Sequence, residues 1–287
     1  MVIQDSCSPI SHSFRPAALL SLPSQLTVDL HCHSNYSDGL PTVAGLEDWC
    51  LRRRAGLALT DHNEVRGSLL LSDRKRVPTL PAIEVGTREG LEFLVYFPRA
   101  ELLEEFYRRG VEPFLLSRFM VRSRVCGLTC LEHARGLGGF VSLAHPFAFG
   151  RKSIGRHLQR ESSNGFATAV LEQVQAIEVF NAGIPSLANT HAAGFYAGLE
   201  KIATLGSDAH TLSDLGNAGV RMQGDGSTRS SELFGQLESA AFEPLAELTY
   251  SPLAKTVAVI AWKHTSFFLL TRSRFRVAGV PRLAIET

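Results

Sequence analysis

The chain has 287 residues, of which 45% are hydrophobic and 20% are charged, so it can bury a sizeable core and is not a disordered polymer. Lys and Arg number 29 against 28 Asp and Glu, and the formal net charge of +1 gives no global field for long nucleic acid or an anionic membrane. The length fits two ordinary domains or one large α/β barrel.

The five cysteines are odd in number and scattered, unlike the even framework of a small secreted domain. A reducing cytoplasm is therefore the expected compartment. Cys126 and Cys130 stand four residues apart, but no second Cys/His pair follows at zinc-finger spacing. We interpret them as small apolar side chains on one helix face.

The two ends of the chain give no targeting or membrane signal. Residues 1–14 lack a basic region followed by an unbroken apolar segment, so they do not resemble a signal peptide. Residues 252–271 are the most membrane-like stretch, but Lys255, Lys263 and His264 interrupt it. We expect this stretch to be packed against the protein and expect no membrane partner.

In chain order, residues 1–24 contain three prolines among serines and predict an extended lead-in. Short apolar runs then recur, each followed by polar or glycine-containing residues, which is typical of buried strands. The seven predicted strands are 26–30, 56–60, 79–83, 93–96, 140–144, 176–180 and 202–205.

Helical patterns lie between these runs, for example at 42–54, 128–137 and 230–241. Because strands alternate with helices, we expect parallel βα units. Residues 105–130 predict an insertion or a helical pair with its arginines on a solvated face.

Potential metal ligands concentrate where the predicted strands end. In chain order these residues are Asp29, His31, His33, Asp38, Asp61, His62, Glu84, His145, Asn181, Asp208 and His210. Five of the ten histidines are among them. Since the carboxyl ends of the strands in a parallel barrel gather at one mouth, these groups are expected to converge.

The pattern as a whole favours a metal site over isolated structural residues. Strand alternation sends His31 and His33 to one side and Cys32 to the other, so two imidazoles can reach one ion. A lone histidine is more often a hydrogen-bonded structural residue than a ligand. So many buried carboxylates and imidazoles without cations, however, would leave charges unpaired at a large energetic cost.

Five stretches resemble, in order and spacing, the motifs of the PHP superfamily, the polymerase and histidinol phosphatase metal-dependent phosphoesterases. They are HCHSNYSDG (31–39), LTDHN (59–63), IEVG (83–86), LAHPF (143–147) and GSDAH (206–210). The resemblance runs from about residue 26 to about residue 220, roughly two thirds of the chain. It implies an α/β fold, a distorted seven-stranded (βα) TIM-like barrel, which we place at 25–225. Residues 226–287 lie beyond the motifs, and we expect a C-terminal extension that packs on the barrel, where it would complete the barrel or cover one of its ends.

The resemblance also implies two or three divalent ions, manganese, zinc or iron. The implied ligands are His31, His33, Glu84 and Asp208 for the first ion, Glu84 and His145 for the second, and Asp38, His62 and His210 for the third. Asp61 is expected to orient His62 or to lie behind the ligands.

One position departs from the family pattern. Relatives often carry a histidine on the fourth strand as a further ligand of the second ion, and Glu92 stands there in this chain. Glutamate binds the same ions, so either Glu92 substitutes for the histidine or the second site is weak. His133 is a competing candidate, but it lies in a helical segment and we favour a surface position.

The implied function is hydrolysis of a phosphate ester by a metal-bridging hydroxide, with Asp208 or His210 assisting proton transfer. Arg151, Lys152 and Arg156 are candidate phosphate contacts, or else an ordinary basic loop, and Asn181 is a candidate substrate contact or a turn cap. The substrate would be a small phosphomonoester, a nucleotide or the end of a short nucleic acid.

Two other functions remain open at this stage. An amidohydrolase-like metal hydrolase is disfavoured because no lysine stands at a strand end to form a bridging carbamate. A catalytically lapsed metal-binding regulatory module is favoured only by Glu92. The sequence does not indicate the oligomeric state.

Overall fold

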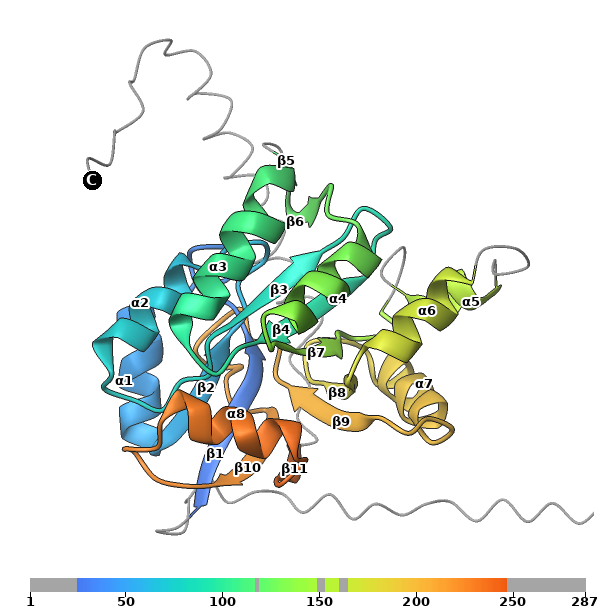
Figure 1. The fold of residues 1–287 in the computed structure, drawn as a ribbon. Helices are drawn as coiled ribbons and strands as arrows, with labels where there is room; N and C mark the ends of the chain where they lie inside the picture. Colours follow the sequence, from blue (N-terminus) through green and yellow to red (C-terminus); the bar gives the residue numbers. More distant parts are fainter. Residues whose placement is uncertain (1–24, 117–118, 149–152, 160–164, 247–287) are drawn as a thin grey trace, which may run out of the picture.

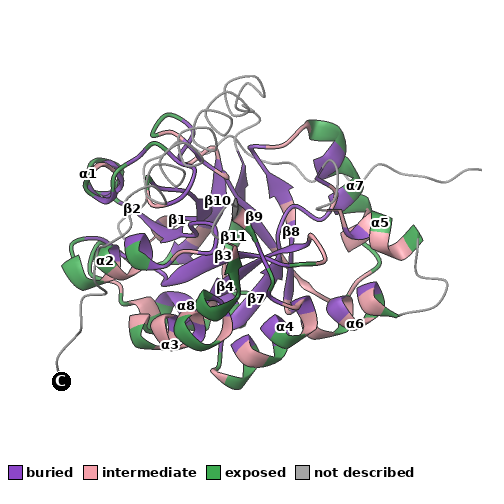
Figure 2. Cartoon of the chain, turned by 90° about the horizontal axis from the view of Figure 1, so that it is seen from above, coloured by how far each residue is buried: buried purple, intermediate pink, exposed green. Residues whose placement is uncertain are grey.

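A computed structural model describes residues 25–116, 119–148, 153–159 and 165–246. The predicted lead-in, the basic residues Arg151 and Lys152, and the apolar stretch at 252–271 lie outside the described residues. Strands occupy the centre and helices cover them, with their exposed faces turned outward (Figure 2). Within the described part of the chain, no helix is long and apolar enough to cross a membrane.

The described elements follow one another along the chain from β1 to β11 (Figure 1). The main strands are β1 (Gln25–Cys32), β2 (Ala55–Leu59), β3 (Ala82–Gly86), β4 (Glu92–Tyr96), β7 (Phe140–Leu143), β8 (Ala176–Asn181), β9 (Ile202–Gly206), β10 (Ala218–Gln223) and β11 (Glu243–Ala246). The helices are α1 (Val43–Arg53), α2 (Arg66–Arg74), α3 (Ala100–Gly110), α4 (Gly127–Gly136), α5 (Ile154–Gln159), α6 (Phe166–Gln173), α7 (Ser186–Tyr196) and α8 (Ser230–Glu238).

The main strands form two mixed sheets, in the orders β11-β10-β1-β2 and β3-β4-β7-β8-β9. Isolated bridges join the sheets at both seams: Cys32 pairs with Ala209 beyond β9, and His62 pairs with Glu84 between the ends of β2 and β3. The α/β class is thus confirmed, whereas the described strands do not make one continuous closed barrel.

Parallel pairing was predicted throughout, and this prediction is wrong for part of the structure. The pairs β1–β2, β7–β8 and β8–β9 are parallel, but β3–β4, β4–β7 and β1–β10 are antiparallel. Only five residues, 87–91, connect β3 to β4, and the Thr87 amide closes the turn by donating to the Leu91 carbonyl. So short a connection has no room for the crossover helix that a parallel pair needs.

All seven predicted strands are present, with the largest boundary error at β3. β3 begins at Ala82 and not at Thr79, because Pro81 has no N–H to donate to a ladder. The predicted helical pair at 105–130 is wrong. That stretch holds the end of α3, a 3-10 turn (Glu112–Phe114), the short strands β5 (Leu115–Leu116) and β6 (Phe119–Ser123), and the start of α4.

A register shift between Asp29 and Cys32 changes the side to which β1 residues point. Leu30 packs in the interior cluster with Tyr96, whose hydroxyl donates to the Leu30 carbonyl. Strict alternation would place Cys32 beside Leu30, but Cys32 packs against α1 with Leu46. The shift therefore turns the histidines at the end of β1 toward the interior.

Residues 230–246 lie within the predicted C-terminal extension and form α8 and β11. β11 pairs antiparallel with β10, with Leu245 opposite Gly219. Leu233 and Leu237 of α8 are fully buried in the same interior cluster as Leu30. These contacts place α8 across the end of the interior that lies away from the histidines.

Replacing Leu237 with alanine is therefore expected to lower the free energy of unfolding of the whole fold by about 2–5 kcal/mol, because it leaves a cavity in the core. Leu187→Ala on α7 is the matched control, since Leu187 is 59% exposed and should cost no more than about 0.5 kcal/mol. Urea unfolding followed by circular dichroism gives both values. Equal midpoints for the two variants would show that α8 is not part of the cooperative unit.

Candidate metal centre

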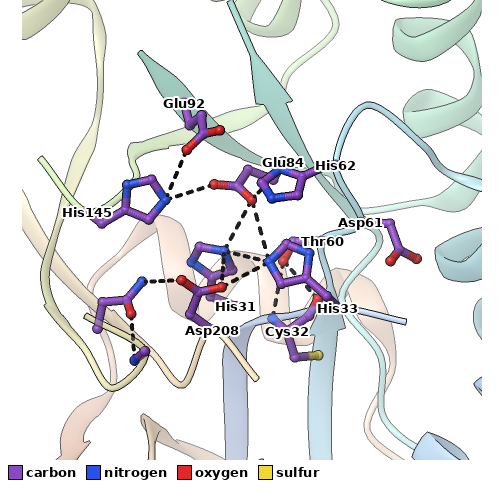
Figure 3. A network of polar contacts seen from close by, with 12 residues as sticks. His31, Cys32, His33, Thr60, Asp61, His62, Glu84, Glu92, His145 and Asp208 are labelled. Carbon is purple, nitrogen blue, oxygen red and sulfur yellow. Dashed lines mark hydrogen bonds and ion pairs between the residues drawn. The ribbon is translucent and has the colours of Figure 1, made fainter. Parts of the chain in front are cut away.

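The predicted ligands converge from both sheets into one buried cluster (Figure 3). All of them except Asp208 are no more than 6% exposed. The cluster consists of His31, His33, Asp38, His62, Glu84, Glu92, His145, Asp208 and His210. The side chain of Asp208 is 14% exposed, which makes it the most accessible member.

Three residues make the first group of the cluster. The Nε2 atoms of His31 and His33 are 3.2 Å apart, and His33 Nε2 is 3.1 Å from Asp208 Oδ1. Donor atoms bound tetrahedrally at about 2.1 Å from one ion stand about 3.4 Å from each other, so this spacing suits a shared cation. Asp208 lies just beyond β9 with a positive φ of 51°, a backbone conformation that residues with side chains rarely adopt.

Glu84 lies between the first group and a second one. Its Oε1 is 3.1 Å from His145 Nε2, while its Oε2 is 3.4 Å from His31 Nε2. Glu92 Oε2 is 3.2 Å from the same His145 nitrogen. Glu92 therefore lies beside His145, and it also forms a candidate ligand group with His62 and Glu84. The two oxygens of Glu84 face different groups, as a bridging carboxylate requires.

The third group surrounds Asp38. His62 Nε2 is 3.5 Å from one Asp38 oxygen and His210 Nε2 is 3.4 Å from the other. The His33 ring stacks between the two histidine rings, at centroid distances of 4.6 and 4.5 Å. His33 thus contacts the third group through its Nδ1 side as well, which the sequence did not indicate.

The cluster keeps the carboxylates of Glu84 and Asp208 ionised despite their burial. Burial alone would raise the pKa of Glu84, but His62 and His31 hold it well below its usual range. Burial likewise opposes ionisation of Asp208, and His31 again holds its pKa well below normal.

The histidines divide into two kinds. Burial, together with the neighbouring His210, lowers the pKa of His33. Burial also disfavours the charged forms of His62 and His210, but carboxylates overcome it: Glu84 and Asp38 raise the pKa of His62 to about 9, and Asp38 raises that of His210 to about 8. Burial also opposes the charged form of His31, but Glu178, Asp208 and Glu84 raise its pKa well above the usual value. Protons on these three rings balance the negative charge of the carboxylates in the metal-free protein.

The donor set fits divalent cations. Among the described residues, the buried atoms His33 Nδ1, Asp38 Oδ2 and His210 Nε2 make no hydrogen bond. Leaving such atoms unsatisfied costs free energy, and a metal ion would satisfy them together. Mixed imidazole and carboxylate ligands suit manganese, iron or zinc better than calcium.

Of the two roles expected for Asp61, its contacts fit a position behind the ligands. Its carboxylate accepts hydrogen bonds from the Ser34 amide at 2.7 Å and from the hydroxyls of Ser34 and Ser37 at 2.6 Å. It points away from the ligands in Figure 3. Asp61 therefore holds the turn that leads to Asp38 and does not orient His62.

Asn181 was predicted either to contact substrate or to cap a turn, and its side chain makes several contacts within the protein. Its Nδ2 donates to Glu178 Oε2 at 3.1 Å and to Asp208 Oδ2 at 3.2 Å, and its Oδ1 accepts from the Gly183 amide. Asn181 is completely buried. These contacts support a role in positioning Asp208.

Sequence reasoning missed Glu178, which contacts His31, His145 and Asn181. The available signal was a carboxylate inside the apolar strand AIEVFN. Alternation, however, places Glu178 and Asn181 on opposite sides of a regular strand. A register shift between Glu178 and Phe180 brings both to the interior.

Other candidates lie outside the cluster. His133 on α4 is half-buried and stacks on Phe106 at a centroid distance of 5.5 Å. Arg156 is exposed on α5. Cys126 and Cys130 belong to none of the candidate ligand groups found among the described residues.

The chain matches no protein-family model and no curated protein sequence. It is similar to solved structures with TM-scores of 0.56. PsfC from Pseudomonas syringae is 18% identical, over 85% of this chain and 99% of that chain. A two-domain protein from Bacteroides vulgatus containing a predicted PHP-like metal-dependent phosphoesterase is 15% identical, over 87% and 74%. The lesion-specific endonuclease Q from Pyrococcus furiosus is 15% identical, over 77% of this chain and 57% of that chain.

A further similar structure is an endonuclease Q complex with a 27-mer duplex substrate that has an abasic lesion at the active site, at a TM-score of 0.55 and 14% identity, over 76% of this chain and 58% of that chain. At these identities the likeness concerns the fold. The fold is thus similar to that of a protein containing a predicted PHP-like phosphoesterase, as the resemblance of the five motifs led us to expect.

Metal binding is expected to release protons at neutral pH, because a ligating imidazole must be neutral and His62 and His210 are protonated in the metal-free protein. Affinity for Mn²⁺ should rise between pH 6.5 and 8 by about tenfold per pH unit for each ring that loses its proton. Calorimetry in buffers of different ionisation enthalpy counts the protons. An affinity that does not change over this range, with no proton release, would contradict the protonation states described.

The stability of the metal-free protein should change in the opposite direction. The two rings have a folded pKa above the unfolded value of 6.5, so their contribution to stability is complete below about pH 6.5. It is lost as the pH rises through about 8 for His210 and about 9 for His62. Thermal unfolding of the chelated protein across this range measures the loss.

Proposed function

We propose that the protein is a metal-dependent phosphoesterase. The observation that carries the proposal is the convergence of nine buried ligands into adjacent groups that share Glu84 and His33. A fold similar to that of a PHP-like phosphoesterase and of endonuclease Q supports it. We also propose that the two sheets form a distorted seven-stranded barrel. The isolated bridges between the sheets at both seams support this architecture.

The groups assign ligands to two or three ions, manganese, zinc or iron. The first ion would be held by His31, His33 and Asp208 with Glu84, the second by Glu84, His145 and Glu92, and the third by Asp38, His62 and His210. When bound, the ions would lower the pKa of a coordinated water and balance the negative charge that develops on the phosphoryl group.

The residues of the chain hold and orient this centre. His210 Nδ1 donates to the Asp208 carbonyl at 2.8 Å, which leaves Nε2 as the ligating atom. That arrangement favours His210 as a ligand over His210 as a proton shuttle. Asp208 is the most exposed of the nine and is therefore the ligand closest to an incoming substrate, where it would accept a proton or orient the leaving group.

The proposed substrates are a small phosphomonoester, a nucleotide or the end of a short nucleic acid. The similarity to endonuclease Q supports the nucleic-acid end, although this chain spans little more than half of that protein. A net charge of +1 argues against tracking of a long backbone, which takes several Lys or Arg contacts. Arg151 and Lys152 stay predicted phosphate contacts.

Removing one ligand from the first group is expected to abolish both metal binding and hydrolysis. His33→Ala and Asp208→Asn should each lower hydrolysis by at least about 100-fold, since each removes charge compensation for the reaction. The assay uses para-nitrophenyl phosphate and bis-para-nitrophenyl phosphate with chelated protein reloaded with Mn²⁺, and bound metal is measured by elemental analysis. Asp225→Asn, in an exposed turn, is the control and should retain full activity.

The same assay separates the alternatives. The ratio of monoester to diester hydrolysis gives the substrate class. Metal binding without hydrolysis of either ester would favour the lapsed regulatory module, and cleavage of amides but not esters would favour an amidohydrolase. Full activity of both variants would exclude this cluster as the catalytic centre.

A further inference from the structure

Glu178 is a buried carboxylate in β8 that contacts three parts of the candidate metal centre and belongs to none of its ligand groups. It is 1% exposed. Its Oε1 accepts a hydrogen bond from His31 Nδ1 at 2.9 Å. Its Oε2 accepts from the His145 amide at 2.7 Å and from Asn181 Nδ2 at 3.1 Å.

The first of these contacts fixes the form of the His31 ring. The contact with the carboxylate oxygen calls for a proton on His31 Nδ1, so once the ring is neutral, as a metal ligand must be, its lone pair lies on Nε2. His31 Nε2 is the atom that faces His33 and Asp208 in the first group. A carboxylate behind an imidazole also increases the basicity of the ligating nitrogen.

The second contact holds an unusual backbone. His145 has a positive φ of 25°, outside the regions that residues with side chains favour. The hydrogen bond from its amide to Glu178 anchors the chain just after β7. In that conformation His145 Nε2 faces Glu84 and Glu92.

The third contact extends to the end of β9. Asn181 donates one N–H to Glu178 and the other to Asp208 Oδ2. The Glu178 carboxylate is thus connected to ligands that follow β1, β7 and β9. β9 itself comes close to Glu178, since a Cβ on Gly206 would lie 2.9 Å from Glu178 Oε1.

We propose that Glu178 is the positioning residue of the metal centre, acting through His31, His145 and Asn181 to set the affinity for the first and second ions. This inference rests on the proposed function. Three donors converge on this one side chain, so an acceptor-only group is required. Glutamine has nearly the same shape, but its NH₂ group would face a donor in either orientation. Toward His31 it would favour the tautomer that cannot ligate through Nε2, and in the other orientation it would oppose the N–H groups of His145 and Asn181.

A purely structural role is distinguished by a matched control. Glu47 on α1 is also 1% exposed, and its Oε2 accepts from Arg74 at 3.0 Å and from Arg76 at 2.8 Å. Glu47 belongs to none of the ligand groups among the described residues. Glu47→Gln should lower stability without changing metal affinity, whereas Glu178→Gln should weaken Mn²⁺ binding by about 10–100-fold.

The experiment uses the full chain stripped of metal and titrated with Mn²⁺ by calorimetry, at a temperature where circular dichroism shows each variant folded. Nitrogen-15 NMR of histidine-labelled, Zn²⁺-loaded protein adds a signature of the contact itself. The His31 Nδ1–H proton, assigned by its loss in His31→Gln, should be observed in the wild type and in Glu47→Gln. It should be lost or strongly shifted in Glu178→Gln.

Glu178→Asp keeps an acceptor-only group on a shorter side chain and should give an affinity between those of the wild type and Glu178→Gln. Wild-type affinity and an unchanged His31 signal in Glu178→Gln would overturn the proposal. If that variant does not fold, the same result in Glu178→Asp would overturn it. A wild-type protein that binds neither Mn²⁺ nor Zn²⁺ would instead refute the proposed function, so the two failures are distinguishable.

Discussion

The ionised carboxylate of Glu84 in the protein interior is the constraint on which the rest of the site depends. Glu84 has no exposed surface, and its negative charge is compatible with burial only because imidazoles from separate strand ends surround it. The three imidazoles belong to His31, His62 and His145, which lie at the ends of β1, β2 and β7. The contact between the two sheets at their seams therefore brings together the imidazoles that compensate the charge of Glu84, in addition to enclosing the core.

Irregular backbone conformations at the strand ends place the groups that compensate the charge of Glu84. β1 and β8 each contain a register shift at the point where they deliver polar groups to the interior. His145 and Asp208 have positive φ values. Gly206 allows β9 to come so close to β1 that a Cβ there would lie 2.2 Å from the Cβ of His31. Strain of this kind persists only where well-packed surroundings enforce it, and here the apolar interior and the helical layer provide them.

The same irregularities explain what the sequence could and could not predict. Runs such as 93–96 and 202–205 identified their strands because continuous apolar stretches signal buried strands whatever their pairing direction. The ligands were identifiable because His31, His62 and their counterparts follow such runs directly. The antiparallel pairing of β4 was not predicted, since periodicity does not report strand direction.

Glu178 was missed for a different physical reason. The expectation that side chains alternate between the two faces of a strand assumes an unbroken register with its neighbour. A shift of one residue reverses which side chains share a face. Asp61 lies behind the ligands and not against His62, because neighbouring residues on an extended chain point in opposite directions. The errors thus concern the residues that support the ligands, whose partners lie far away in the chain.

The second and third groups differ in their proportion of carboxylate and imidazole ligands, which bears on the ions that the proposed centre would hold. Glu92 places a second carboxylate beside His145, so this group contains two carboxylates and one imidazole, whereas the third group contains one carboxylate and several imidazoles. Oxygen-rich sites favour harder cations and nitrogen-rich sites favour zinc. The two ends of the cluster would therefore prefer different ions, with Glu84 setting the charge that they share.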